Sequence, residues 1–147
     1  MRAPSVASFL AVAVLATTAC ASLAPPELVS AKVYPYKPEE RGKFVEICFD
    51  RALERREEYS LEFDLLTRQD ATLTCNGTLV DSFGEKPSAC QRFNVFVYCV
   101  GQRTPPEKRA IADKEIRPGN VRAVTVRLYR TSGAPSKPLM SRTVNVQ

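Results

Sequence analysis

The sequence predicts an all-β fold, a single-domain antiparallel β-barrel or sandwich with about seven to eight strands, stabilised by disulfides. Two observations predict it. Short stretches of alternating apolar and polar residues recur at near-regular spacing, and glycine, proline, asparagine or charged residues separate them. Four cysteines lie within these stretches. At 147 residues the chain has room for one ordinary domain.

Residues 1–21 have the features of a secretory signal peptide. Phe9 to Ala16 is a short apolar core, and Ala19-Cys20-Ala21 has the small-x-small form of a cleavage site. We therefore expect cleavage before Ser22 and a mature β domain over residues 22–147. The apolar core is too short to span a bilayer, and no second apolar run follows. The predicted localisation is extracellular, without stable membrane insertion.

An alternative for the N-terminus is a bacterial lipoprotein signal in which Cys20 is the acylated residue. Ala19, Ala21 and Ser22 fit this pattern, whereas Thr17 stands where a leucine is usual. Under this alternative the protein is a structural subunit of a bacterial envelope. The mature N-terminus distinguishes the two.

The first half of the domain predicts three strands. Leu28 to Tyr36 alternates loosely and reaches the prolines that favour sheet edges. Phe44 to Phe49 alternates more clearly, and the charged residues 50–58 after it predict a long solvated connection. Tyr59 to Leu65 has one apolar and one polar face, as in a strand with one wet side.

The second half predicts the remaining strands. After Ala71 to Cys75, the glycines and proline within Asn76 to Ser88 predict a loop. The stretch that ends at Cys99 predicts a strand with Phe93, Val95 and Val97 on one face and Phe96 and Tyr98 on the other, typical of a central or covered strand. Gly101 to Lys108 predicts a loop. Three further strands are expected, the first of them weak: Ala110 to Ile116, Val121 to Arg130 and Leu139 to Val146. No stretch predicts a convincing helix.

Signal cleavage would leave four cysteines, an even number that suits an oxidising compartment. Of the three pairings, we favour Cys75–Cys90, which closes a short loop, together with Cys48–Cys99. The alternative in which Cys48 and Cys99 are buried free thiols stays open.

The segment from Phe44 to Cys99 carries a family resemblance. Val45 to Arg51 reads V-E-I-C-F-D-R, Ser60 to Leu65 reads S-L-E-F-D-L, and Thr72 to Cys75 reads T-L-T-C. Cys90 and F-N-V-F then follow. In order and spacing this pattern resembles the Alternaria major allergen family of small secreted fungal β-barrel proteins.

The resemblance implies a non-enzymatic secreted protein of the allergen, elicitor or effector type. Such a protein binds a host extracellular protein, for example a plant defence protein, and modulates host defence. The chain differs from the family in having no tryptophan and no cysteine after Cys99. Binding residues of the family therefore do not transfer to it.

The composition argues against catalysis and against a cofactor. The chain has no histidine, no C-x-x-C pair, no G-x-S-x-G motif and no glycine-rich phosphate loop. Glu62 with Asp64, and Asp113 with Glu115, form carboxylate pairs on single strand faces in this prediction. We interpret both pairs as solvated charges, because a glycosidase needs its two carboxylates across a cleft.

Charge is distributed unevenly along the chain. Residues 22–85 hold 8 Lys and Arg against 13 Asp and Glu, whereas residues 86–147 hold 12 against 3. A basic face attracts acidic partners, and nucleic acid is the least expected of these for a secreted protein. The alternative is that the two halves pack side by side and partly cancel.

If Cys48 and Cys99 pair, the loops that follow them leave the same end of the domain. That placement predicts a basic rim for binding a charged protein surface. Its members are Arg51, Arg55, Arg56, Arg103, Lys108 and Arg109. Separately, Asn76-Gly77-Thr78 is an N-glycosylation acceptor triplet in a predicted loop, so Asn76 is a candidate glycosylation site in a eukaryotic source.

Overall fold

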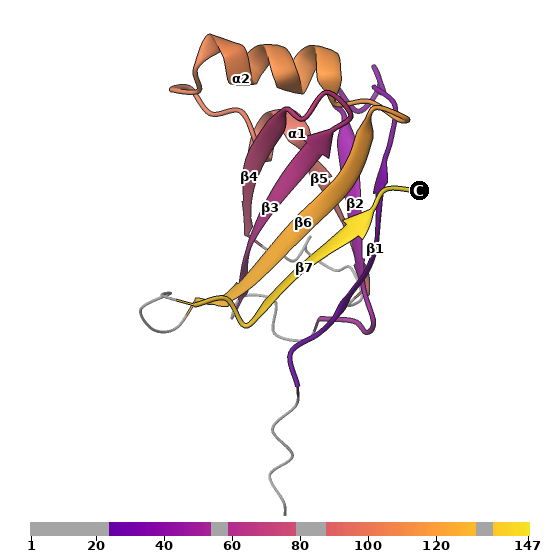
Figure 1. The fold of residues 1–147 in the computed structure, drawn as a ribbon, viewed down its shortest axis with the longest axis vertical. Helices are drawn as coiled ribbons and strands as arrows, with labels where there is room; N and C mark the ends of the chain where they lie inside the picture. Colours follow the sequence, from indigo (N-terminus) through magenta and orange to yellow (C-terminus); the bar gives the residue numbers. More distant parts are fainter. Residues whose placement is uncertain (1–23, 54–58, 79–87, 132–136) are drawn as a thin grey trace, which may run out of the picture.

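The computed structural model describes residues 24–53, 59–78, 88–131 and 137–147, and within these ranges the chain forms a β-sandwich (Figure 1). Seven strands lie in two antiparallel sheets, of strand order β1-β2-β5 and β4-β3-β6-β7. The predicted all-β class is therefore confirmed. Of the two predicted architectures the sandwich is correct, because the described strands do not close into a barrel.

The smaller sheet contains β1 (Leu28–Val33), β2 (Phe44–Phe49) and β5 (Cys90–Asn94). Both neighbours of β2 run antiparallel to it. Along β2 every second residue is buried, starting at Val45, so one face of this sheet lines the core. The predicted strand from Phe44 to Phe49 is confirmed at both ends.

The larger sheet contains β3 (Tyr59–Thr67), β4 (Thr72–Thr78), β6 (Val121–Arg130) and β7 (Met140–Asn145). The strand β4 is an edge of this sheet, and β3 is its hydrogen-bonded neighbour. The triplet that begins at Asn76 lies within β4, so the prediction of a loop there was wrong.

The prediction of one strand through Cys99 was also wrong. The chain leaves β5 at Asn94 and forms the short helix α1 (Val95–Tyr98). Asn94 causes this change, since its Oδ1 accepts a hydrogen bond from Phe96 N at 3.0 Å, which caps a helix. Val95 is buried and Val97 is exposed, so the two do not share the inward face that strand alternation predicted.

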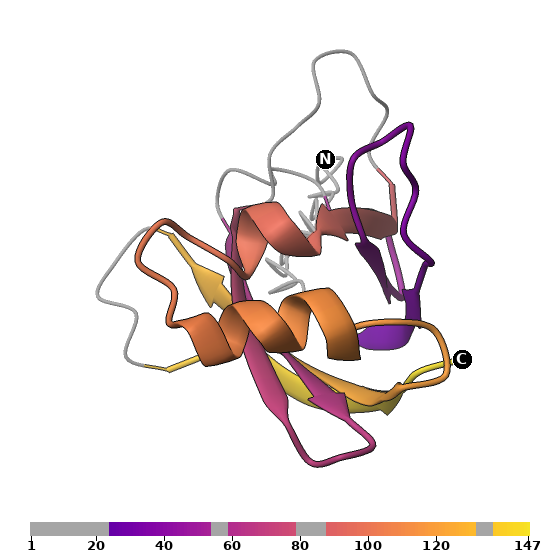
Figure 2. The ribbon, with the colours of Figure 1, turned by 90° about the horizontal axis from the view of Figure 1, so that it is seen from above.

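A second helical segment replaces the weak strand expected from Ala110 to Ile116. It consists of α2 (Pro106–Ala110) and the π-helical turn η2 (Ile111–Glu115), and it crosses one end of the sandwich (Figure 2). Pro106 occupies the first helical turn, where its missing N–H costs nothing. No helix in the described ranges is long and apolar enough to cross a membrane.

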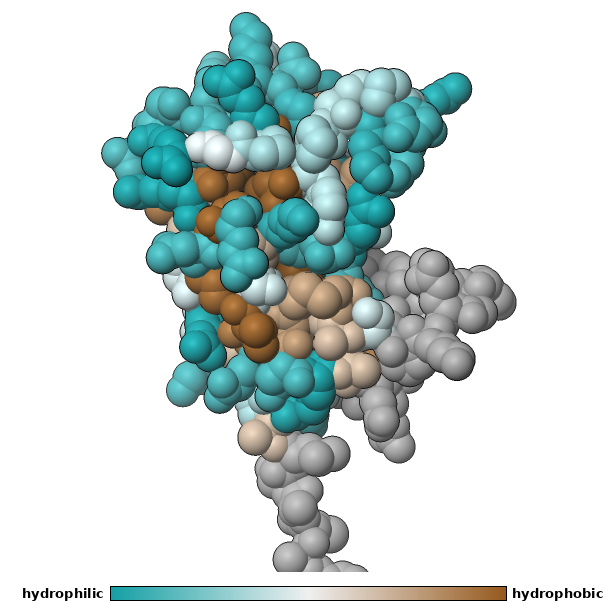
Figure 3. Space-filling model, turned by 90° about the vertical axis from the view of Figure 1, so that its right-hand side faces the viewer, coloured by the Kyte–Doolittle hydropathy of each residue, from teal (hydrophilic) through white to brown (hydrophobic). Residues whose placement is uncertain are grey.

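The core lies between the two sheets. Phe63 from β3 and Phe93 from β5 meet there with ring centroids 5.2 Å apart, and both are almost fully buried. On one side of the sandwich β1 and β7 meet through a bridge between Ala31 and Val146. Apolar atoms reach the surface of that side between hydrophilic groups (Figure 3). On the other side α1 packs beside β4.

The disulfides are Cys48–Cys90 and Cys75–Cys99, so all four cysteines are paired but the favoured pairing was wrong. Cys48 and Cys90 lie directly opposite each other on β2 and β5, with Cα atoms 4.0 Å apart. Cys75 and Cys90 lie in different sheets, although one connection joins them. The helical turn α1 brings Cys99 to Cys75 in the core.

Candidate functional site

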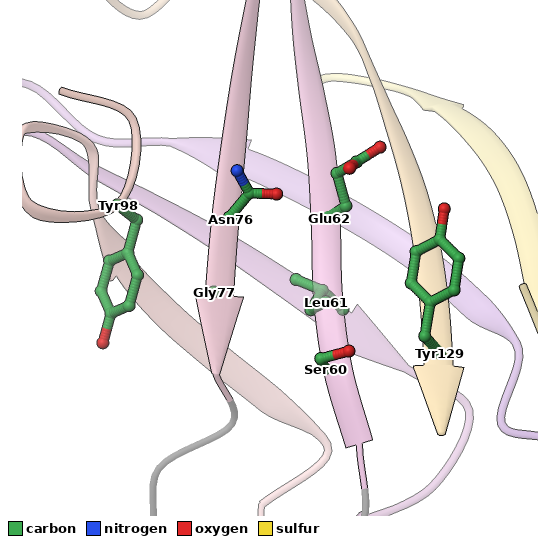
Figure 4. A pocket seen from close by; sticks show the side chains of 7 residues that line it. All are labelled: Ser60, Leu61, Glu62, Asn76, Gly77, Tyr98 and Tyr129. Atoms are coloured by element: carbon green, nitrogen blue, oxygen red, sulfur yellow. The ribbon is translucent and has the colours of Figure 1, made fainter. Parts of the chain in front are cut away.

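Two hollows flank the edge strand β4, and they share Asn76 and Tyr98 in their linings. The first has a volume of about 470 Å³ and lies across β4, β3 and β6 (Figure 4). Its other lining residues are Ser60, Leu61, Glu62, Gly77 and Tyr129. The second has about 480 Å³ and extends from Asn76 and Tyr98 to the loop before α2. Both hollows therefore lie beside the same stretch of β4.

Tyr98 is positioned by packing beneath it. Its ring meets the Phe93 ring edge to face, with centroids 5.4 Å apart. Figure 4 shows Tyr98 on one side of Asn76 and Glu62, and Tyr129 on the other. Alternation predicted Tyr98 on a strand face. Because α1 is a helix, Tyr98 instead lies at the open edge of β4.

The loop before α2 is held by one side chain, Arg109. Its guanidinium donates three hydrogen bonds, to the carbonyl oxygens of Gly101, Gln102 and Thr104, at 2.9 to 3.0 Å. The hydroxyl of Thr104 also accepts a hydrogen bond from Gly101 N. Arg109, one of the residues predicted to contact a partner, therefore positions this loop.

Two cations line the second hollow beside this loop. Arg103 and Lys108 are exposed, and neither forms a salt bridge within the described part of the chain. Val97 lines the same hollow, and 68% of its surface is exposed, the largest value among the bulky apolar residues that the structure describes. An exposed aliphatic side chain beside two unpaired cations forms a mixed apolar and basic rim.

Arg51 is not part of this rim, which contradicts the prediction. It follows β2, and it donates to the carbonyl of Ala24 and pairs with Asp50 at 3.5 Å. The start of β2 lies at the other end, where Lys43 contacts η2. A six-residue strand of about 20 Å separates these ends. The premise for the rim, a Cys48–Cys99 bond, is also absent. Arg55 and Arg56 lie outside the described residues.

A three-residue ion cluster lies on the outer face of the larger sheet. Arg127 on β6 donates to Glu62 at 2.6 Å and to Asp64 at 2.7 Å, and both carboxylates lie on β3. The hydrogen bond that Arg127 donates to Asp64 is the main reason that the pKa of Arg127 is raised above its usual value. The Oδ1 atom of Asp64 is buried without a hydrogen-bond partner. The predicted solvated carboxylates are therefore members of an ion cluster.

Lys43 is a buried cation that the sequence did not single out. Its ammonium donates to the carbonyl of Ala112 at 3.1 Å and to that of Asp113, and so ties η2 to β2. Burial lowers the pKa of Lys43, and the charge of Asp113 opposes this shift. Its ammonium also lies 5.8 Å from the ring centroid of Phe96. These contacts give Lys43 a structural role.

A cluster of potential metal ligands on the smaller sheet consists of Glu46, Cys48 and Cys90. Both sulfur atoms belong to the disulfide, so neither is a thiolate that could bind a metal ion. The other predicted carboxylate pair, Asp113 with Glu115, lies in the helical turn η2, where Glu115 accepts hydrogen bonds from Asn120. Neither group suggests a metal or cofactor site.

The chain matches no family model, no curated protein and no solved structure. The resemblance to the Alternaria major allergen family is therefore a hypothesis that depends on the motifs between Phe44 and Cys99 alone.

Proposed function

We propose that the protein is a secreted, non-enzymatic binding protein that recognises an acidic surface on a host extracellular protein, as an effector or allergen-like protein does. Arg103, Lys108 and Val97 form the contact surface. The single observation that carries this proposal is that two exposed cations lie at one hollow without a salt bridge to any residue in the described ranges. Exposed cations that no ion pair holds to the fold are available to an acidic partner.

The loop is preorganised for such contact. The three hydrogen bonds from Arg109 hold its backbone in one conformation, so less conformational entropy is lost when a partner binds. No residue of α2 is buried, so the charged side chains of this helix have no role in core packing. The two cations raise the rate of association with an acidic surface and the selectivity for it, and Val97 supplies apolar contact area.

Binding chemistry fits this surface better than catalysis does. Glu62 and Asp64, the nearest carboxylate pair, both pair with Arg127. The disulfides are typical of proteins in oxidising compartments, which supports export.

The test compares two variants that carry the same change in charge. We expect Arg103→Glu with Lys108→Glu to abolish capture of acidic proteins from host extracellular fluid. Arg130→Glu with Lys137→Glu should leave capture intact, because these exposed residues do not line the hollow. Quantitative mass spectrometry of the retained proteins is the measurement. Equal capture by both double variants would refute the proposed surface.

A second pair tests the apolar contribution. Val97→Ser should weaken capture, whereas Val29→Ser should not, although Val29 on β1 is also well exposed. Mass spectrometry of the mature N-terminus tests export separately. Cleavage before Ser22 is expected for a secreted protein, whereas an acylated Cys20 would support the bacterial lipoprotein alternative.

A further inference from the structure

We infer that Asn76 carries an N-linked glycan whose first sugars lie in the first hollow, against Tyr98 and Tyr129. The inference rests on the proposed export, because this modification takes place in the secretory pathway. It does not depend on the proposed protein partner. It gives a role to the acceptor triplet and to the first hollow, neither of which the basic rim uses.

Asn76 has the required position. It is exposed on the outer face of β4, directly opposite Glu62 on β3. It also lines both hollows, so a group attached to its side chain begins at the edge of the first hollow. Figure 4 shows its amide rising from the strand beside Glu62. A glycan at this position has recessed surface on either side.

The surroundings suit a sugar. A pyranose ring has an apolar face of C–H groups, which packs on aromatic rings, and a rim of hydroxyl groups, which need hydrogen-bond partners. Tyr98 and Tyr129 supply the rings, and Ser60 and Glu62 supply polar groups between them. Tyr129 lies opposite Ser60 on β6, two strands away from β4. This separation is about 10 Å, within reach of two linked pyranose rings.

The modification is a group transfer that the cell's glycosyltransferase performs. The Asn76 Nδ2 atom forms a bond to the anomeric carbon of the first N-acetylglucosamine. The bond between that carbon and the lipid pyrophosphate carrier breaks, the pyrophosphate leaves with the electron pair, and Nδ2 loses one proton. No atom is oxidised or reduced. The donor is a lipid-pyrophosphate-linked oligosaccharide, and Thr78 completes the acceptor triplet.

The glycan would also protect a vulnerable part of the fold. The strand β4 has a hydrogen-bonded neighbour on one side, β3, and such edges can pair with other chains and cause aggregation. The helix α1 and the Cys75–Cys99 disulfide cover part of this edge. A hydrated oligosaccharide at Asn76 would shield the part beside the hollows.

The experiment uses the mature chain, secreted from a glycosylating eukaryotic host with a heterologous leader. We expect glycopeptide mass spectrometry to find a glycan on Asn76 in the native protein and in Thr78→Ser, and none in Thr78→Ala. Trimming to the two N-acetylglucosamines of the core then gives a defined modification. We expect nuclear Overhauser contacts between these two sugars and the rings of Tyr98 and Tyr129.

The stability readout is a comparison of glycosylated and unglycosylated forms. The trimmed glycan should raise the Tm of the native domain by about 2–4 °C, the shift that a modest contact gives in a domain of this size. Tyr129→Ala should remove this increment. Tyr36→Ala should retain it, because Tyr36 is an exposed tyrosine that does not line either hollow.

Two results would overturn the inference. One is an unmodified Asn76 in the secreted native protein and in Thr78→Ser. The other is an equal Tm increment in the native protein and in Tyr129→Ala, with no contact between sugar and tyrosine. Arg103→Glu with Lys108→Glu should leave both readouts unchanged. Failure of the glycan inference is thereby distinguishable from failure of the proposed partner surface.

Discussion

Phe93 packs directly against the backbone of Gly77, so closely that a Cβ atom added to Gly77 would lie 2.9 Å from a Phe93 ring carbon. Gly77 belongs to β4 in the larger sheet, and Phe93 belongs to β5 in the smaller one. The contact therefore joins the two sheets, and it supports Tyr98, whose ring packs on Phe93. The absence of a side chain at Gly77 allows the sheets to approach each other beneath the first hollow.

Replacing Gly77 by alanine should lower the free energy of unfolding by about 1–3 kcal/mol, because the added methyl group overpacks a rigid core contact. Urea denaturation measures this loss. Gly101→Ala is the control, since its added Cβ would have 3.8 Å to its nearest neighbour. Similar stabilities for the two variants would show that the sheets can move apart without cost.

The two disulfides should contribute unequally to stability. Replacing both cysteines of either bond by alanine should cost about 2–5 kcal/mol. We expect the larger loss for Cys75 and Cys99, because these side chains are buried in the core whereas Cys48 and Cys90 are half-buried on the outer face. Thermal or denaturant unfolding of the two double variants measures the order.

Peptide mapping under non-reducing conditions provides the control for this prediction. It should find Cys48 joined to Cys90, and Cys75 joined to Cys99. A peptide that joins Cys75 to Cys90 would contradict the assignment of β4 and β5 to different sheets.

Lys43→Met should destabilise the protein at neutral pH by about 1–3 kcal/mol, because it leaves the carbonyls of Ala112 and Asp113 without their donor. Lys114→Met is the control, since Lys114 is exposed on the same helical turn. Guanidinium denaturation near pH 7 measures both. Equal stabilities would show that water replaces the ammonium group readily.

Lys43 should also give a specific pH dependence. Its pKa is lower in the folded protein than the usual lysine value of 10.5, so the folded state binds fewer protons than the unfolded state as the pH rises from the folded pKa toward 10.5. Burying the charged ammonium group lowers the free energy of unfolding. This loss is fully present below the folded pKa, and it disappears as the pH rises toward 10.5. The native protein should therefore gain stability relative to Lys43→Met as the pH rises from neutral toward 10.5. A constant difference over this range would contradict the lowered pKa.

Removal of Arg127 should destabilise the larger sheet through its two carboxylates. In Arg127→Leu, Glu62 and Asp64 would repel each other without a cation, at a cost of about 1–2 kcal/mol for these partly exposed groups. The combined variant Arg127→Leu with Glu62→Gln should recover part of that loss. Denaturation at low and at high salt measures the effect, which should shrink as salt screens the repulsion. A loss independent of both salt and Glu62 would indicate lost packing of the Arg127 stem.

Much of the fold was predictable from local sequence. The strands β2 and β6 have the predicted boundaries, because alternating burial leaves a direct signature of period two. Glu62 and Asp64 were correctly placed on one face of β3 for the same reason. Turn residues marked most of the connections, since their backbone preferences are also local.

The errors occur where a single contact overrides a pattern. The sequence between Asn94 and Cys99 alternates like a strand, yet the cap made by Asn94 starts a helix there. From Ala110 to Ile116, the hydrogen bonds of Lys43 complete a helical turn that the short apolar pattern did not predict. In the acceptor triplet, Gly77 suggested a loop, whereas its role is to admit Phe93.

The sequence alone determined that this is a small all-β domain with an even set of four cysteines after residue 21 and an acceptor asparagine, because alternation, cysteine number and triplets can be counted along the chain. Tertiary structure decided which cysteines pair and which charged residues share a surface. Both outcomes depend on which sheet each strand joins, and strand pairing is a long-range choice made by side chains far apart in the sequence. Arg51 and Arg103 therefore lie at opposite ends of the sandwich, and Asn76 lies between two tyrosines from different elements.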